Sequence, residues 1–111
     1  MDLAEACYVL VRVFPRDELF GLTSQVRRAA ASVPANIAEG YGRELTRSYI
    51  QSLRVAQGSL KELETHLLLA QRVGILTSER LSPVMARCDE TGKILRALIR
   101  ALSSKLDRDA E

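Results

Sequence analysis

Apolar residues recur at steps of three and four along nearly the whole chain, and this periodicity is typical of packed amphipathic α-helices. Short breaks containing Pro, Gly or polar residues divide it into four segments. Connections of two to five residues make consecutive helices antiparallel neighbours. The sequence therefore predicts an all-α fold, an antiparallel up-down-up-down four-helix bundle with a short first helix. The expected helices run from about Asp2 to Val13, Asp17 to Gly40, Thr46 to Gly74 and Thr77 to Leu106.

Individual residues mark the expected helix ends. Pro15 ends the first helix, because Pro disfavours the helical conformation in the residue before it. Pro34 is expected to kink the second helix. Thr46 is a suitable N-cap for the third helix, and Gly74 is a C-terminal stop signal. We expect a bundle domain over residues 1–106 and a polar, frayed tail over residues 107–111.

The predicted helices differ in length. At roughly 1.5 Å per residue, a first helix of about 12 residues covers less than half of a third helix of about 28 residues. Apolar surface beyond the first helix would stay open, and such surface favours self-association.

Composition excludes several classes of protein. Aromatic residues make up 5% of the chain, which argues against β-sandwiches and barrels. No apolar run approaches about 20 residues, so no membrane span is expected. The acidic residues Asp2 and Glu5 stand where a signal peptide needs basic ones, so we expect a cytoplasmic protein. The net charge of +2 is too small to indicate nucleic acid by itself.

Residues with catalytic or metal-binding potential are few. Cys7 and Cys88 fit no metal or redox spacing and are expected in the core. His66 is the sole histidine, and its place on the flank of the third helix favours a solvated side chain over a general base. Neither a Cys/His pair nor a glycine-rich phosphate loop is present. We therefore predict no enzyme activity, no catalytic residue, no metal site and no cofactor.

One charge pattern passes a geometric test. At about 100° per residue, the basic residues of the third helix fall within roughly 40° of one another and about 140–160° from its apolar stripe. They form a basic ridge, which could bind phosphates or could be a solvated face that pairs with acids of a neighbouring helix or subunit. No aromatic residue alternates with them, so base stacking is not expected here. The ridge consists of Arg47, Arg54, Lys61 and Arg72, with Arg43 added if the helix begins early.

The second helix carries a run of small residues. Residues 27–43 read RRAAASVPANIAEGYGR, and the alanines allow another helix to approach closely. If the segment forms a tight helix contact, Asn36 and Glu39 satisfy buried or interfacial hydrogen-bond donors. A ligand pocket is the alternative interpretation of the same segment.

The chain also resembles a known family from Phe14 to Leu76. The matching stretches are FPRDELFGL, TSQVRRAAASVPANIAEGYGR, IQSLRVAQGSLKELETHLLLA and the GIL turn, in order and without gaps. They are similar to the 23S rRNA intervening-sequence protein family, also called the four-helix bundle protein family. The positions that carry the family signature are Arg27, Arg28, Asn36, Glu39, Gly40 and Arg43.

The resemblance has implications for assembly and partners. It implies a four-helix bundle that assembles as a ring-shaped homopentamer. It also implies kinship with the accessory variability determinant proteins of diversity-generating retroelements, which are basic pentamers that bind nucleic acid and a reverse transcriptase. The partners expected from it are further copies of the chain, RNA or DNA, and a reverse transcriptase or another acidic protein.

Two functions follow as hypotheses. The first is a non-catalytic homo-oligomer that binds nucleic acid through the basic ridge, whose charge repeats in each subunit. The second is a protein-interaction scaffold whose ridge meets acidic partner surfaces without binding nucleic acid. Salt dependence of binding to RNA or DNA separates them, since counterion release makes phosphate binding fall steeply with salt.

Overall fold

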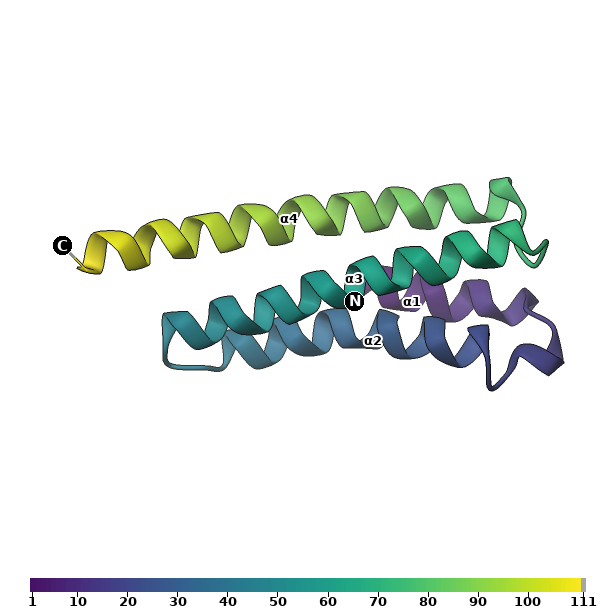
Figure 1. Ribbon diagram of the computed structural model, residues 1–111, viewed down its shortest axis with the longest axis horizontal. Helices are drawn as coiled ribbons and strands as arrows, with labels where there is room; N and C mark the ends of the chain where they lie inside the picture. The colour runs from purple at the N-terminus through teal and green to yellow at the C-terminus, as the bar shows by residue number, and fades with distance from the viewer. Residues whose placement is uncertain (111) are drawn as a thin grey trace.

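Four α-helices make up most of the chain in the computed structural model, which describes residues 1–110 (Figure 1). Two short 3-10 turns lie between the first and second helices, and no strand occurs within residues 1–110. The all-α prediction is therefore confirmed. The elements are α1 (Asp2–Leu10), η1 (Val11–Val13), η2 (Arg16–Glu18), α2 (Leu22–Tyr41), α3 (Thr46–Arg72) and α4 (Ser78–Ala110).

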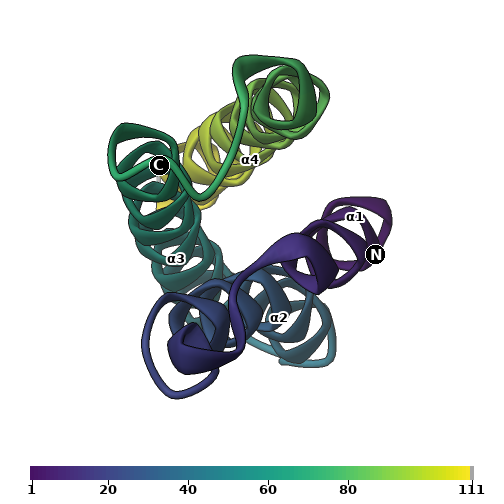
Figure 2. The same cartoon turned by 90° about the vertical axis from the view of Figure 1, so that its right-hand side faces the viewer.

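The helices follow one another around the bundle in chain order, as Figure 2 shows. α2 and α3 pack against each other most extensively, and α4 packs against α3. α1 contacts α2 and the first part of α4. The result is a rod of 54 × 23 × 19 Å in up-down-up-down order.

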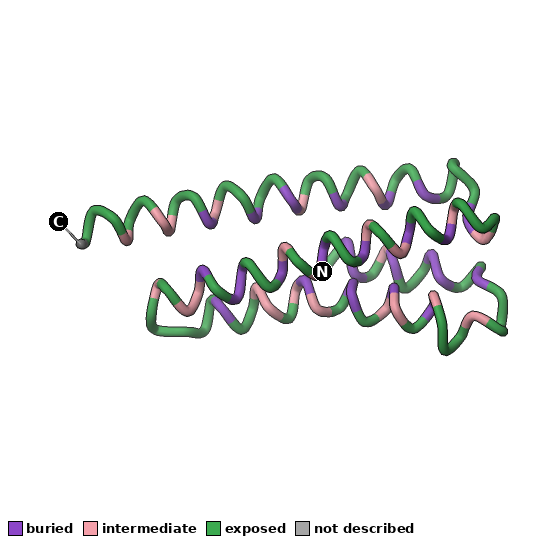
Figure 3. The backbone as a smooth tube through the Cα atoms, in the orientation of Figure 1, coloured by how far each residue is buried: buried purple, intermediate pink, exposed green. Residues whose placement is uncertain are grey.

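The core follows the predicted apolar stripes. Buried residues recur on the inward side of all four helices, as Figure 3 shows. Leu53, Leu63 and Leu67 of α3 and Leu95 of α4 are among the largest side chains with almost no exposed surface. Burying apolar surface stabilises a fold by about 25 cal/mol per Å². The apolar stripes that the helices bury against one another are therefore the main source of bundle stability.

The short first helix is confirmed, and its length leaves an asymmetry. α1 spans nine residues, whereas α4 spans 33. The groove between α1 and α4 is lined by α4 residues from Glu79 to Arg87 only. The second half of α4 therefore packs on α3 without α1 beside it (Figure 1).

Two helix starts differ from the prediction. α2 begins at Leu22 rather than near Asp17, because Glu18 accepts a hydrogen bond from the Leu22 amide at 3.2 Å and a 3-10 turn precedes it. Thr46 is the first helical residue of α3 and not its N-cap. The cap is Leu45, an extended residue without a side-chain cap, so the expected Thr46 cap is wrong.

Other ends agree with the prediction. Gly74 adopts φ +84° after α3, a left-handed conformation that a side chain resists. Thr77 caps α4, because its hydroxyl oxygen accepts a hydrogen bond from the Arg80 amide at 3.3 Å. α2 continues through Pro34 to Tyr41.

The polar C-terminal segment is helical. α4 continues past Leu106 to Ala110, so the helix ends later than the sequence predicts. Backbone i to i−4 hydrogen bonding can continue a helix past its last apolar seam residue. Residue 111 of the predicted tail lies outside the described residues. Across residues 1–110, no helix is both long and apolar enough to cross a membrane.

Candidate nucleic-acid interface

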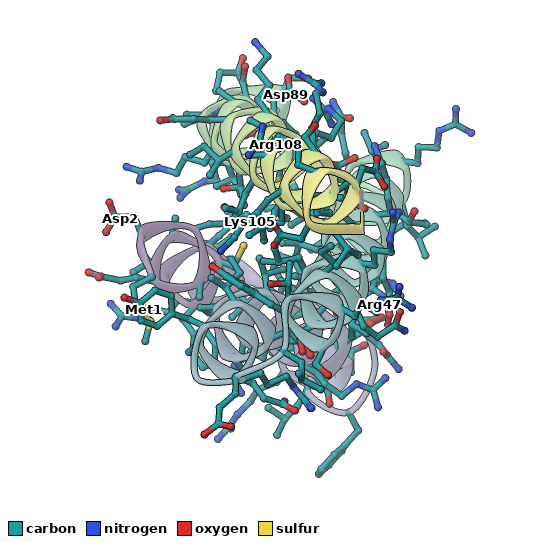
Figure 4. All side chains as sticks on the ribbon, turned by 90° about the vertical axis from the view of Figure 1, so that its left-hand side faces the viewer. Met1, Asp2, Arg47, Asp89, Lys105 and Arg108 are labelled. Carbon is teal, nitrogen blue, oxygen red and sulfur yellow. The ribbon has the colours of Figure 1, made fainter. Side chains whose placement is uncertain are left out.

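The basic ridge of α3 lies on the surface. Arg47, Arg54, Lys61 and Arg72 are all exposed along one side of the helix. Figure 4 shows Arg47 on the outer side of α3, away from α1. Arg43 does not join them on α3. It lies in the connection between α2 and α3, because α3 begins only at Thr46.

Few acidic side chains neutralise these cations. Lys61 pairs with Glu64 at 3.4 Å, and Arg43 pairs with Glu39. Both pairs join residues three or four apart in the chain, so neither links the ridge to a neighbouring helix. Within residues 1–110, no salt bridge involves Arg47, Arg54 or Arg72. The ridge therefore keeps most of its charge in the single chain.

α4 adds two cations that the sequence reasoning missed. Lys93 and Arg96 face Arg54 and Lys61 across a hollow of about 450 Å³ between α3 and α4. A helical-wheel test of α4 would have shown that the two residues share one flank beside its apolar seam. Only the packing of α4 on α3 shows that this flank adjoins the ridge. We call this hollow the α3–α4 groove, and its lining is Arg54, Gln57, Gly58, Leu60, Lys61, Glu64, Cys88, Asp89, Gly92, Lys93 and Arg96.

Two glycines shape the α3–α4 groove. Gly92 is buried where α4 meets α3, and a Cβ there would lie 3.5 Å from Leu60 Cδ2 and 3.2 Å from Arg96 Nη1. Gly58 is exposed, and a Cβ there would have no neighbouring atom within 4 Å. The packing of α4 on α3 thus uses Gly92, whereas no contact within residues 1–110 requires a glycine at position 58.

The charge in the groove is mixed but unevenly placed. Glu64 and Asp89 line it together with the four cations. The Glu64 side chain is only 18% exposed, and Lys61 is its salt-bridge partner. Arg54, Lys93 and Arg96 make no salt bridge within residues 1–110. The groove therefore keeps three cations that are free to meet an anion.

A second hollow continues along the same pair of helices. It measures about 320 Å³ and is lined by Arg47 and Arg54 of α3 and by Ser103, Leu106 and Asp107 of α4, among others. Arg54 borders both hollows, so three ridge residues lie beside a track of two neighbouring hollows between α3 and α4. Arg72 lines neither hollow.

The small residues of α2 allow close packing on α3. A Cβ on Gly40 would lie 2.8 Å from Tyr49 Cδ1 and 2.9 Å from Ser52 Cβ. The hydroxyls of Ser32 and Ser59 are 2.7 Å apart and link the two helices. These contacts favour the tight helix contact over a ligand pocket. A hollow of about 200 Å³ nearby is lined partly by Asn36, Glu39 and Arg43.

Other signature residues also bind within the chain. Asn36 donates to the Ser32 backbone carbonyl at 2.8 Å. The Arg27 guanidinium lies 5.8 Å from the centre of the Tyr8 ring, which ties α2 to α1. Arg28 is exposed and donates a hydrogen bond to Gln25. Apart from Arg28, these residues have a structural role in the bundle.

The two cysteines and the histidine, which could support catalysis, lie in the core or beside another side chain of the same helix. Cys7 and Cys88 are free and buried, as predicted, and burial raises the pKa of their thiols to about 11 and about 12. His66 is partly buried rather than solvated, with Nε2 3.5 Å from a Glu62 carboxylate oxygen. In the part of the chain that the structure describes, no group of three or more potential metal ligands occurs.

Comparisons with known proteins agree with this architecture. The model of a family described as 23S rRNA-intervening sequence protein matches residues 1–97. A crystal structure of a protein of unknown function from the S23 ribosomal protein family of Bacteroides thetaiotaomicron has a similar fold, with a TM-score of 0.75 and 24% sequence identity. The similarity covers 88% of this chain and 95% of that chain. No curated protein matches this chain by sequence.

Proposed function

This chain belongs to the 23S rRNA-intervening sequence protein family, and from that premise we propose that it is a non-catalytic protein that binds RNA through the basic side formed by α3 and α4. The observation that carries the proposal is the track of cations between the two helices. Arg47, Arg54, Lys93 and Arg96 project there without a salt bridge within residues 1–110.

Electrostatics explains why a weakly charged chain can bind a polyanion. The net charge is only +2, but local potential depends on where the charges lie. Arg supplies most of the 16 basic residues, and its planar guanidinium can donate two parallel hydrogen bonds to a phosphate. Phosphate contacts of this kind give affinity without sequence preference. We therefore expect binding that tolerates many RNA sequences.

Self-association supports the same function. We propose that the chain forms a homopentamer, as its resemblance implies, which would repeat the basic track five times. Large apolar side chains on the surface support assembly, among them Phe20, Tyr41 and Ile94, with 93%, 79% and 59% of their surface exposed. Repetition raises the effective concentration of sites along one RNA molecule.

A charge-removal variant tests the proposed function. The triple variant Arg47→Gln, Arg54→Gln and Lys61→Gln removes three exposed cations and leaves the core intact. Because Gln has a helix propensity close to that of Arg and Lys, stability should change by only a few tenths of a kcal/mol per site. We expect RNA affinity at low salt to fall by about tenfold or more, measured by fluorescence anisotropy.

A matched control has the same total charge as this triple variant but loses its cations from another surface. The variant Arg12→Gln, Arg80→Gln and Arg87→Gln also removes three exposed cations, none of which lines the track. It should bind RNA with nearly unchanged affinity. Equal losses in both variants would point to net charge alone, and an unbound wild-type protein at low salt would favour the scaffold function.

A further inference from the structure

The α3–α4 groove contains a glycine that the fold does not explain. Gly58 lies inside α3, where Gly costs roughly 1 kcal/mol of helix stability relative to Ala. A Cβ there would have open space for at least 4 Å, so no neighbouring helix demands its absence. A glycine at a site where packing permits a side chain leaves room for something outside the chain to approach the backbone.

The surroundings of Gly58 indicate what could approach. Arg54 and Lys61 lie one turn before and nearly one turn after it on α3, and Lys93 and Arg96 form the opposite wall. No aromatic side chain lines the groove, so it has no surface on which a base could stack. The groove also contains the carboxylates of Glu64 and Asp89, but its four cations outnumber them. An excess of cations around an open backbone suits the phosphates of an anionic chain rather than its bases.

The shape of the track favours one form of nucleic acid. Arg47, Arg54 and Lys61 follow each other at seven-residue steps, which places them on one nearly straight line of roughly 21 Å at 1.5 Å per residue. Two antiparallel helices form the walls, with axes typically about 10 Å apart. A single strand can lie along such a line, whereas each backbone of a duplex winds away from it.

We propose that the α3–α4 groove holds the sugar-phosphate backbone of single-stranded RNA, with one phosphate seated over Gly58 between Arg54, Lys61, Lys93 and Arg96. This inference rests on the proposed function and adds the strand form and the seat. The RNA phosphates either replace Glu64 as the partner of Lys61 or bind beside the Lys61–Glu64 salt bridge. Bases face away from the groove, so base identity has little effect on affinity.

The deciding variant is Gly58→Leu. It leaves every charge in place and extends a side chain into the groove from a position with open space, so the bundle should stay folded and its thermal midpoint should not fall. The matched control is Thr65→Leu, which places the same side chain seven residues along the same face of α3 but outside the groove.

Binding is measured with a fluorescent single-stranded RNA of about 15 nucleotides and with the corresponding duplex, at low salt. We expect the wild type to prefer the single strand, and oligomers rich in A or U to bind alike. Gly58→Leu should weaken single-strand binding by about tenfold, whereas Thr65→Leu should stay within about twofold of the wild type.

The outcomes separate this inference from the proposed function. If the wild type binds RNA and loses affinity in the Arg47, Arg54 and Lys61 triple variant, but Gly58→Leu binds as the wild type does, the groove inference is wrong and the proposed function stands. Equal affinity for duplex and single strand would also overturn the inference. If the wild type binds neither form at low salt, the proposed function itself fails.

Discussion

At the scale of single residues, the glycines of this chain differ in what they do. Gly40 lies at the closest approach of α2 and α3, where a Cβ would meet Tyr49 Cδ1 at 2.8 Å. Gly58 faces open space on α3. The same substitution should therefore have opposite effects at the two positions.

We expect Gly40→Ala to destabilise the protein by about 1–2 kcal/mol, because the added methyl forces two packed helices apart. Gly58→Ala should stabilise it by up to about 1 kcal/mol, because Ala is the better helix former and meets no clash. Urea unfolding followed by circular dichroism measures both changes. A stabilised Gly40→Ala protein would show that α2 and α3 are not as close as the structure places them.

The two cysteines give a prediction about pH. Burial raises the pKa of Cys7 to about 11 and that of Cys88 to about 12, from an ordinary value of 9.0. Well below pH 9 both thiols are protonated in the folded and unfolded chains, so they add no pH dependence there. Above pH 9 the unfolded chain releases protons that the folded chain retains, and stability falls as pH rises.

Chemical denaturation at pH 8 and pH 10.5 tests this pH effect. The wild-type protein should lose stability between the two values. The double variant Cys7→Ala and Cys88→Ala should lose less stability, because it lacks the two buried thiols. Equal losses in both proteins would contradict buried thiols with raised pKa values.

At the scale of elements, the turn between α3 and α4 depends on one backbone conformation. Gly74 has φ +84°, which costs an L-residue about 1 kcal/mol or more. Gly42, after α2, has an ordinary φ of −77° and room for a Cβ. We expect Gly74→Ala to lower the thermal midpoint by about 5 °C and Gly42→Ala to leave it nearly unchanged. A similar midpoint for both variants would contradict this assignment.

The elements also show how far sequence reasoning reaches. Periodicity located all four helices, because each must bury one apolar stripe. It misplaced the start of α2 and the end of α4. At the start of α2 the Glu18 carboxylate accepts a hydrogen bond from the Leu22 amide, and at the end of α4 no large apolar residue marks where the helix stops. Lys93 and Arg96 were missed for another reason. Their place beside Arg54 depends on how α4 packs on α3, for example Gly92 against Leu60, and one helix cannot reveal the register of two.

At the scale of the whole molecule, the rod carries both the cations of the α3–α4 groove and exposed apolar side chains such as Phe20 and Tyr41. We expect light scattering at tens of micromolar to give about five times the 12.3 kDa mass of the chain. Assembly raises the number of cations that one RNA molecule can meet. A monomeric mass would contradict the homopentamer and leave each chain to bind alone.

Whether the ridge pairs with acids of a neighbouring subunit is also decided at this scale. If the ridge pairs with acids of another subunit, the triple variant of Arg47, Arg54 and Lys61 should reduce the mass of the assembly. If the ridge binds RNA, the mass should stay constant while RNA affinity falls. Light scattering of the variant beside the wild type distinguishes these outcomes.

The most direct test of the central claim is the salt dependence of RNA binding. Counterion release makes the logarithm of the affinity fall linearly with the logarithm of the salt concentration, with a slope set by the number of phosphate contacts. We predict a steep slope for the wild type and a slope smaller by about 2 to 3 for the Arg47, Arg54 and Lys61 triple variant. An unchanged slope and affinity in the triple variant would contradict phosphate binding by α3.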